Sequence, residues 1–422
     1  MSNPQLASNA SSALLATINE SPGTANNSYV YSETDAITPQ TSMQWDNLVK
    51  SSGSAASGQS LHWDINKNGY LTKIVLGLRF RFNQGTPAIS NYMAPNWAVN
   101  AISEITISSG GRVIDRWTRE SLFAHVSEQP DYVQKAYVAG LGMQALHKPL
   151  TVVDNVTQDV FLNLPGFWEQ NKTALNTSFL QPLSVTVRFS NWANISSGDI
   201  TLETDSDYTR LYCQYRNMQD PVDSATIQSN YGDGLLSQLI TTHSQENGKT
   251  FTAEATDAVT EYTVDLKETS CVESMYVMMI MNPVAGDNVE AGIPQKINNI
   301  EFKSNGNSYV NLPAELLQLY GTQSVHGDKG FGACNYDTEN SEANGNMKYV
   351  YKIDFGQGST DRNELTNLLS FRELSNPQVT VKFQAATTQV QSSKIHLFVT
   401  YKRKELSNTV SSNGKFQIAL SN

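Results

Sequence analysis

The sequence has few of the features that mark exported, membrane-spanning or disulfide-linked proteins. Its most apolar stretch, residues 275–281, is far shorter than the roughly 18 to 20 apolar residues that cross a bilayer. Residues 1–20 lack the basic, apolar and small-residue parts of a secretory signal, so we expect no export by that route. The three cysteines, Cys213, Cys271 and Cys334, form no CxxC pair, which favours free thiols over a disulfide framework.

Charged residues are also scarce. They make up 16% of the chain, and 29 Lys+Arg against 40 Asp+Glu leave a formal charge of -11. Proteins that follow a phosphate backbone concentrate Lys and Arg on one face, so we predict no direct, sequence-specific binding of nucleic acid. The abundant neutral polar residues suit strands and loops more than charged surface helices.

Sequence-local signs of catalysis and metal binding are missing. No GxSxG, HExxH or GxxxxGK[ST] pattern occurs, and the glycines of residues 326–332 (HGDKGFG) do not follow a strand and open a helix as a nucleotide-binding turn does. Neighbouring carboxylates such as Asp205 and Asp207, or Asp257 and Glu261, are interpreted as solvated loop residues. No two histidines have the HxH spacing that directs imidazoles toward one metal; they are His62, His125, His147, His243, His326 and His396. We therefore predict no enzyme and no catalytic, cofactor-binding or metal residue.

Short β-rich runs separated by Gly, Pro, Asn and Asp follow one another from about residue 58. In residues 71–82 (LTKIVLGLRFRF) and 183–189 (LSVTVRF), apolar side chains alternate with polar ones, as in strands with one buried face. A chain of 422 residues is long enough for two domains of about 150 to 200 residues, each with its own core.

The order of these elements occurs twice, which decides the fold prediction. Residues 63–78 match 264–279 at an offset of 201 (265 minus 64), and residues 101–123 match 296–318 at an offset of 195 (297 minus 102). The second match aligns Gly111 with Gly306 in a hairpin turn. In both copies a helix is predicted after the hairpin, capped by Thr118 in the first and by Asn311 in the second, with Pro313 early and Gly321 as a stop.

Two further matches follow in the same order. Residues 185–189 (VTVRF) match 379–383 (VTVKF) at an offset of 194, and residues 211–216 match 397–402 at an offset of 186 (397 minus 211). Alternating strands often resemble each other by chance, but four matches in one order indicate a duplication. We therefore predict an all-β fold of two tandem β-sandwiches with short helices in loops.

The repeat sets the expected domain boundaries. Residues 1–57 are rich in Ser, Ala, Asn and Thr, and are predicted to form an extended N-terminal arm. The first sandwich is expected over residues 58–219, a linker with a short helix over 220–250, the second sandwich over 251–408, and a C-terminal tail over 409–422. Residues 416–420 are expected to form a short strand that docks on a neighbour.

The six tryptophans border apolar runs, and we assign them to cores and subunit contacts rather than to a platform for sugars or bases. They are Trp45, Trp63, Trp97, Trp117, Trp168 and Trp192.

One local pattern resembles a known family. Leu164-Pro165-Gly166-Phe167-Trp168, followed by Ala174-Leu175 and by residues 183–187 (LSVTV), is similar to a stretch in the first jelly roll of the double jelly-roll major capsid proteins of tailless DNA phages and large eukaryotic DNA viruses. The inserted Gly166 departs from the Leu-Pro-Phe-Trp pattern of the family. The resemblance covers residues 60 to 405 in architecture and about 30 residues in motif.

The resemblance implies that the two tandem sandwiches are eight-stranded jelly rolls, and it implies a structural function. Three chains would form a homotrimer, and their six sandwiches a pseudo-hexagonal capsomer that tiles an icosahedral shell. Its partners would be neighbouring capsomers and minor capsid, penton or cement proteins; an internal membrane is left open. The protein would reside in the virion after assembly in the host cytoplasm, without a cofactor.

Two other functions remain open at this stage. A carbohydrate-binding or glycan-processing protein of two jelly rolls would be a monomer with a ligand pocket, and a vertex or spike protein would be a pentamer or a fibre.

Overall fold

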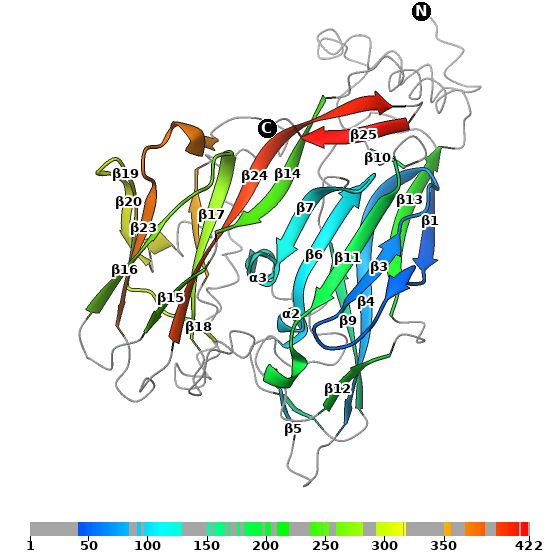
Figure 1. Cartoon of the computed structure of the whole chain (residues 1–422), viewed down its shortest axis with the longest axis horizontal. Helices are drawn as coiled ribbons and strands as arrows, with labels where there is room; N and C mark the ends of the chain where they lie inside the picture. Colours follow the sequence, from blue (N-terminus) through cyan, green and yellow to red (C-terminus); the bar gives the residue numbers. More distant parts are fainter. Residues whose placement is uncertain are drawn as a thin grey trace, which may run out of the picture.

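A computed structural model describes most of the two repeats. The described residues are 41–83, 91–93, 97–128, 150–152, 156–164, 168, 175–177, 181–195, 199–203, 209–218, 237–246, 248–252, 259–281, 293–314, 316–317, 350–355, 368–384, 394–412 and 415–420. Most of them lie in antiparallel strands that form four large sheets, arranged as two sandwiches side by side (Figure 1). Within the described part, no helix has the length and apolar character needed to cross a membrane.

The first sandwich pairs a six-stranded sheet with a five-stranded one. The six-stranded sheet runs β1 (Thr41–Leu48), β13 (Leu211–Met218), β4 (Tyr70–Asn83), and β4 also pairs with β9 (Val156–Asn163), β10 (Leu175–Asn176) and β12 (Asp199–Leu202). The five-stranded sheet runs β2 (Ser52–Gly53), β3 (Ser60–Asp64), β11 (Leu183–Phe189), β6 (Ile102–Ser109), β7 (Arg112–Thr118). A small sheet and three short helices accompany it: β5 (Asn91–Met93) with β8 (Leu150–Val152), α2 (Trp97–Asn100), α3 (Arg119–Glu128) and the 3-10 helix η4 (Trp192–Asn194).

The second sandwich pairs an eight-stranded sheet with a four-stranded one. The larger sheet runs β14 (Ser237–Gln245), β24 (Lys394–Ser412), β17 (Cys271–Met281), β18 (Ile293–Gln295); β15 (Lys249–Thr252) and β25 (Lys415–Leu420) also pair with β24, and β21 (Tyr351–Asp354) and β22 (Leu369–Ser370) with β17. The smaller sheet runs β16 (Val259–Asp265), β23 (Gln378–Gln384), β19 (Asn299–Ser304), β20 (Asn307–Pro313). The 3-10 helix η8 (Phe371–Glu373) follows β22.

The two sandwiches have the same topology. The order β3-β11-β6-β7 in the first is repeated as β16-β23-β19-β20 in the second, and β1-β13-β4 is repeated as β14-β24-β17. The predicted duplication and the all-β fold are therefore confirmed. Each sandwich contains more described strands than the expected eight, because short strands of two to four residues add to the sheet edges.

The strand register agrees with three of the four sequence matches. Trp63 pairs with Val185 and Val185 with Ile107; in the second copy Val264 pairs with Val379 and Val379 with Phe302. These pairs are related by the offsets 201, 194 and 195. Because side chains alternate between faces, a common register places equivalent apolar residues in each core.

The fourth match is wrong by two residues relative to the first. Leu211 pairs with Leu76, whereas Val277, which the first match equates with Leu76, pairs with Val399 rather than with Leu397. A shift of two residues keeps every side chain on its original face. The hydrophobic alternation therefore fits either register equally well.

The hairpin turn is the same in both copies. Gly110 and Gly111 have φ of 56° and 81°, and Asn305 and Gly306 have φ of 49° and 78°. Two consecutive residues at positive φ are what a two-residue type I′ turn requires, and Gly and Asn adopt this conformation most readily. The predicted alignment of Gly111 with Gly306 is confirmed.

Three expectations about the segments outside the repeats differ from the structure. Residues 41–48, expected in the arm, form β1 and pair along their whole length with β13 of the first sandwich. The described part of the expected linker helix, residues 237–241, instead lies in β14, because the long β24 offers β14 a complete ladder of backbone partners. The strand near the C-terminus exists as β25, but it pairs with β24 of its own chain.

The second predicted helix cap is also wrong. Asn311 lies within β20, opposite Glu301, and the helical residues 314, 316 and 317 follow only after Pro313. The strand therefore extends further than expected, since the pairing with β19 continues to Pro313. Gly321 lies outside the described residues.

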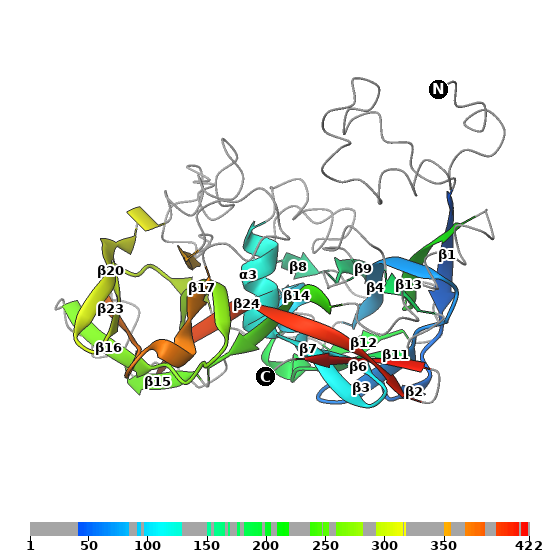
Figure 2. The same ribbon diagram turned by 90° about the horizontal axis from the view of Figure 1, so that it is seen from above.

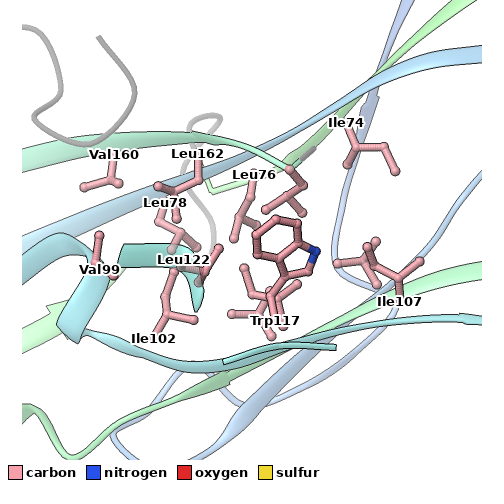
Figure 3. Close-up of a cluster of buried hydrophobic side chains, with 14 of the residues drawn as sticks. Ile74, Leu76, Leu78, Val99, Ile102, Ile107, Trp117, Leu122, Val160 and Leu162 are labelled. Carbon is pink, nitrogen blue, oxygen red and sulfur yellow. The ribbon is translucent and has the colours of Figure 1, made fainter. Parts of the chain in front are cut away.

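Each sandwich has its own apolar core. In the first, side chains from β4, β6, β9, α2 and α3 surround the indole of Trp117 (Figure 3). In the second, residues of β17, β19, β23 and β24 form a separate cluster that includes Met275, Ile300 and Val381. The Cys213 thiol lies in the first core, where burial raises its pKa to about 12, whereas Cys271 is exposed; both are free thiols.

We predict that equivalent core positions contribute similarly to stability. Ile105 and Ile300 are both fully buried and pair with Val187 and Val381, so Ile105→Ala and Ile300→Ala should each lower the free energy of unfolding by about 2–5 kcal/mol. Val113→Ala is the control, because this β7 side chain is 56% exposed and should change stability by less than about 0.5 kcal/mol. Denaturant unfolding measures all three. If Ile300→Ala lowered the free energy of unfolding no more than the control does, the second sandwich would not have the apolar core described here.

Candidate functional site

The region that the fold offers as a functional site is the junction between the two sandwiches. Helix α3 stands between them, and β14 and β24 run from the second sandwich to the first (Figure 2). Strand β14 lies beside β7, the edge strand of the five-stranded sheet. The junction thus joins one edge of the first sandwich to the outer face of the large sheet of the second.

Helix α3 begins where the sequence predicts. The Thr118 hydroxyl accepts a hydrogen bond from the Ser121 backbone N–H at 3.3 Å, and Ser121 Oγ accepts one from the Thr118 N–H at 2.8 Å. This reciprocal cap satisfies backbone donors that the first turn would leave free. Leu122, Phe123 and Ala124 are buried in the first core, which fixes the helix against the end of β7.

The apolar part of the junction comes from strand β17. Met275, Val277 and Met279 face the core of the second sandwich, whereas the alternate residues Tyr276, Met278 and Ile280 belong to the core cluster of the first. Ile240 of β14 and Phe398 of β24 join that first cluster as well. Because burial of a side chain such as Met or Ile contributes roughly 1.5–3 kcal/mol, this shared core holds the two sandwiches together.

The polar part of the junction is a buried aspartate–histidine pair. Asp115 of β7 is 2% exposed, and its carboxylate accepts hydrogen bonds from the His243 backbone N–H at 2.8 Å and lies 3.1 Å from His243 Nδ1. The His243 ring also stacks on Trp117, with ring centroids 3.6 Å apart and planes inclined by 31°. Directional contacts of this kind set the angle between the sandwiches, which apolar contacts alone leave adjustable.

Carboxylates with opposite pKa shifts lie beside this pair. Burial raises the pKa of Glu405, and the nearby Arg403 guanidinium only partly offsets that effect. Burial also acts on Glu268, but hydrogen bonds from Ser244 Oγ and from the Ser270 backbone, together with Arg403, lower its pKa overall. Arg403 bridges the two carboxylates, with N–O distances of 3.3 Å to Glu405 and 3.8 Å to Glu268.

The four histidines of the described regions lie in three separate places. His62 contacts Thr186 and Asp64, His396 contacts Thr250, and His125 and His243 both contact Trp117. Within the described ranges, no group of three or more His, Cys, Asp or Glu side chains could hold a metal ion. His147 and His326 lie outside those ranges, as do Asp205, Asp207, Asp257 and residues 326–332.

Four of the tryptophans assigned to cores and subunit contacts are buried: Trp63, Trp117, Trp168 and Trp192. Trp45 of β1 is 51% exposed, and the Trp97 side chain lies outside the described part. Glu261, expected in a loop, instead lies within strand β16, where its cross-strand partner Lys382 forms a surface ion pair with it at 2.8 Å. Sequence reasoning missed Asp115 and His243, because nothing in the sequence links two residues that are 128 positions apart.

Comparison by sequence finds no matching family model and no matching curated protein. The fold, however, matches solved structures over nearly the whole chain. VP54 of PBCV-1, fitted into a reconstruction of the virophage Sputnik, has a TM-score of 0.65 at 11% identity, covering 94% of this chain and 99% of that chain. The Faustovirus major capsid protein has a TM-score of 0.61 at 8% identity, covering 97% and 100%, and the mavirus major capsid protein 0.52 at 11%, covering 93% and 94%. These likenesses show that the chain has the double jelly-roll fold.

We expect Asp115 to be important for stability. Asp115→Ala leaves the donors of His243 without their acceptor in a buried place, which should cost about 1–3 kcal/mol for each unsatisfied group. The matched control is Asp64→Ala, which breaks a similar Asp–His contact of 3.2 Å in which the Asp64 side chain is 61% exposed; such surface pairs contribute about 0–1 kcal/mol. Thermal unfolding of both variants tests the difference. Equal effects would contradict a structural role for the buried pair.

The two carboxylates beside the pair should respond to pH with opposite signs. A lowered pKa means that Glu268 stabilises the fold above its ordinary pKa of about 4.3 and loses this effect as the pH falls. A raised pKa means that Glu405 destabilises the fold as the pH rises through its folded pKa. Glu268→Gln should therefore lower, and Glu405→Gln raise, the unfolding free energy at pH 7, and both differences should vanish in acid. Unfolding titrations between pH 3 and 8 measure this, and shifts of the same sign would refute it.

Proposed function

We propose that this chain is a major capsid protein that assembles as a homotrimer into pseudo-hexagonal capsomers of an icosahedral viral shell. The observation that carries the proposal is the repeated topology: two sandwiches of equal strand order are joined side by side through a buried junction. The likeness to the solved capsid proteins over nearly the whole chain supports it.

The duplication explains how such a chain fills a hexagonal tile. Three copies related by a threefold axis bring together six sandwiches of the same topology, so each tile has nearly sixfold surroundings from only three chains. The junction supports this function because a tile needs a fixed angle between its two halves. Apolar contacts hold the two sandwiches together, and the Asp115–His243 pair sets the angle between them.

The other parts of the proposal concern partners and location. The protein would reside in the virion, after assembly in the host cytoplasm, and contact neighbouring capsomers and minor capsid, penton or cement proteins. Wide heterologous contacts, each of modest strength, would hold the shell. We propose no catalytic, cofactor or metal residue, and no direct sequence-specific contact with the genome, in line with the formal charge of -11.

The carbohydrate-binding alternative has less support. A sugar platform needs aromatic faces that are open to solvent. Among the side chains that the structure describes, Trp45 and Tyr309 are at least half exposed, but they lie on β1 and β20, in different sandwiches.

The homotrimer can be tested by mass. Light scattering of the purified full chain should give about 140 kDa, three times the 46.5 kDa of one chain, as expected for a closed threefold assembly. The value should persist on dilution to low micromolar concentration. A mass of one chain at high concentration would refute the capsid proposal and favour the monomeric alternative.

A further inference from the structure

The two surfaces that meet at the junction each have an equivalent elsewhere in the molecule. One is the edge of the first sandwich at β7, which we call the β7 edge: Ile114, Asp115 and Trp117. The other is on β14, the strand beside β7, and we call it the β14 face: the buried Thr241, and His243, which contacts Asp115 and Trp117. Since the second sandwich repeats the first, β20 and β1 provide the corresponding β20 edge and β1 face.

Strand pairing identifies the residues of the β1 face. Asp46, Cys213 and Ile74 form a row across the first large sheet, and Ser244, Tyr401 and Met275 form the equivalent row across the second. One position earlier in each strand, Trp45 therefore corresponds to His243. Two positions before that, Met43 corresponds to Thr241.

The β20 edge follows from the paired hairpins. Asp115 and Trp117 pair with Ile107 and Ile105, and the equivalent Phe302 and Ile300 pair with Val310 and Leu312. Both hairpins have a bulge at the same place, which leaves Ile114 and its equivalent Tyr309 without a partner. The β20 edge therefore consists of Tyr309, Val310 and Leu312.

Exposure differs sharply between the equivalent positions. Ile114 is 3% exposed but Tyr309 is 54%, and Thr241 is 1% exposed but Met43 is 64%. Val310 and Leu312 are half-buried, whereas Asp115 and Trp117 are fully buried. Residues that are buried at the junction within the chain therefore have equivalents that are exposed to solvent on β1 and β20. Large exposed apolar side chains of this kind mark contact surfaces.

We propose that the β1 face of one copy covers the β20 edge of the next copy, and so repeats between chains the junction that each chain makes within itself. This inference rests on the proposed function and names the contact that would close the trimer. The two surfaces lie at opposite ends of the molecule (Figure 1), as a head-to-tail ring requires.

In each of the two junctions the facing residues match in polarity. Within the chain, Asp115 meets His243; between chains, the corresponding residues Val310 and Trp45 meet. A polar residue therefore faces a polar one, and an apolar residue an apolar one. This difference between the two junctions also disfavours contact of the β1 face with the β7 edge of another chain. Such a contact would bury the Asp115 carboxylate against Trp45 without a hydrogen-bond partner.

Charge at either surface should break the ring. Trp45→Glu and Tyr309→Glu each place a carboxylate in the proposed contact at a side chain that is at least half exposed. The Tyr309 ring also contacts the buried Phe302, with ring centroids 5.5 Å apart, so the Tyr309→Glu variant is first checked for a wild-type unfolding transition. Because a central aromatic residue is often worth 30-fold or more in affinity, we expect each variant to lose the trimer at low micromolar concentration. Val259→Glu is the control: Val259 is 51% exposed, but lies on β16 at the opposite edge of the sheet from β20, and this variant should remain trimeric.

A crosslink tests the contact without weakening it. In a Cys271→Ser, Cys334→Ser background, Trp45→Cys with Tyr309→Cys should give covalent dimers and trimers with a short bis-maleimide. Each single cysteine should give monomers only, because the contact joins unlike surfaces.

The outcomes separate the two proposals. A monomeric wild type would overturn both the capsid function and this contact. A trimeric wild type whose Trp45→Glu variant stays trimeric and whose double cysteine variant gives no covalent trimer would overturn the contact alone. Loss of the trimer in both glutamate variants, with the crosslinked ladder, would establish it.

Discussion

The structure depends most on a strand that is buried on both faces. From Met275 to Ile280 every side chain of β17 is buried, with odd positions in the core of the second sandwich and even positions against the first. In an antiparallel sandwich the outer face of each sheet commonly contacts solvent. Here the outer face of the sheet that contains β17 packs against the first sandwich instead. The second sandwich therefore has no independent solvent-facing surface at this point, and the two halves form one body.

Apolar burial alone would leave the angle between the two sandwiches poorly defined. The polar residues of the junction fix that angle through directional hydrogen bonds. The carboxylate of Asp115 reaches a backbone N–H and a ring nitrogen of His243, and Trp117 lies under the same ring. A buried carboxylate is tolerated only with such partners. The orientation of the two sandwiches that keeps these contacts is therefore favoured over orientations that break them. The capsid function that we propose requires a rigid two-sandwich unit of this kind.

The sequence predicts the repeated part of the fold well, since alternation and Gly turns are local signals. The hairpins with Gly111 and Gly306, the VTVRF and VTVKF strands, and the Thr118 cap all lie as expected. The fourth match failed by two residues because a period of two cannot detect such a shift. Residues 237–241 of β14 resemble a helical segment in sequence, because the partner strand β24 that makes them extended lies more than 150 residues away. The apolar run at residues 275–281 did carry a signal for burial on both faces, but the identity of the covering surface is a tertiary property that no local pattern contains.

The central claim is that each sandwich meets its neighbour in the same way, within the chain and between chains. Averaged electron micrographs of the purified protein test it most directly. The account predicts a hexagonal outline of six lobes with threefold symmetry and equal spacing around the ring. Two-lobed particles, or three pairs of lobes separated by gaps, would contradict it.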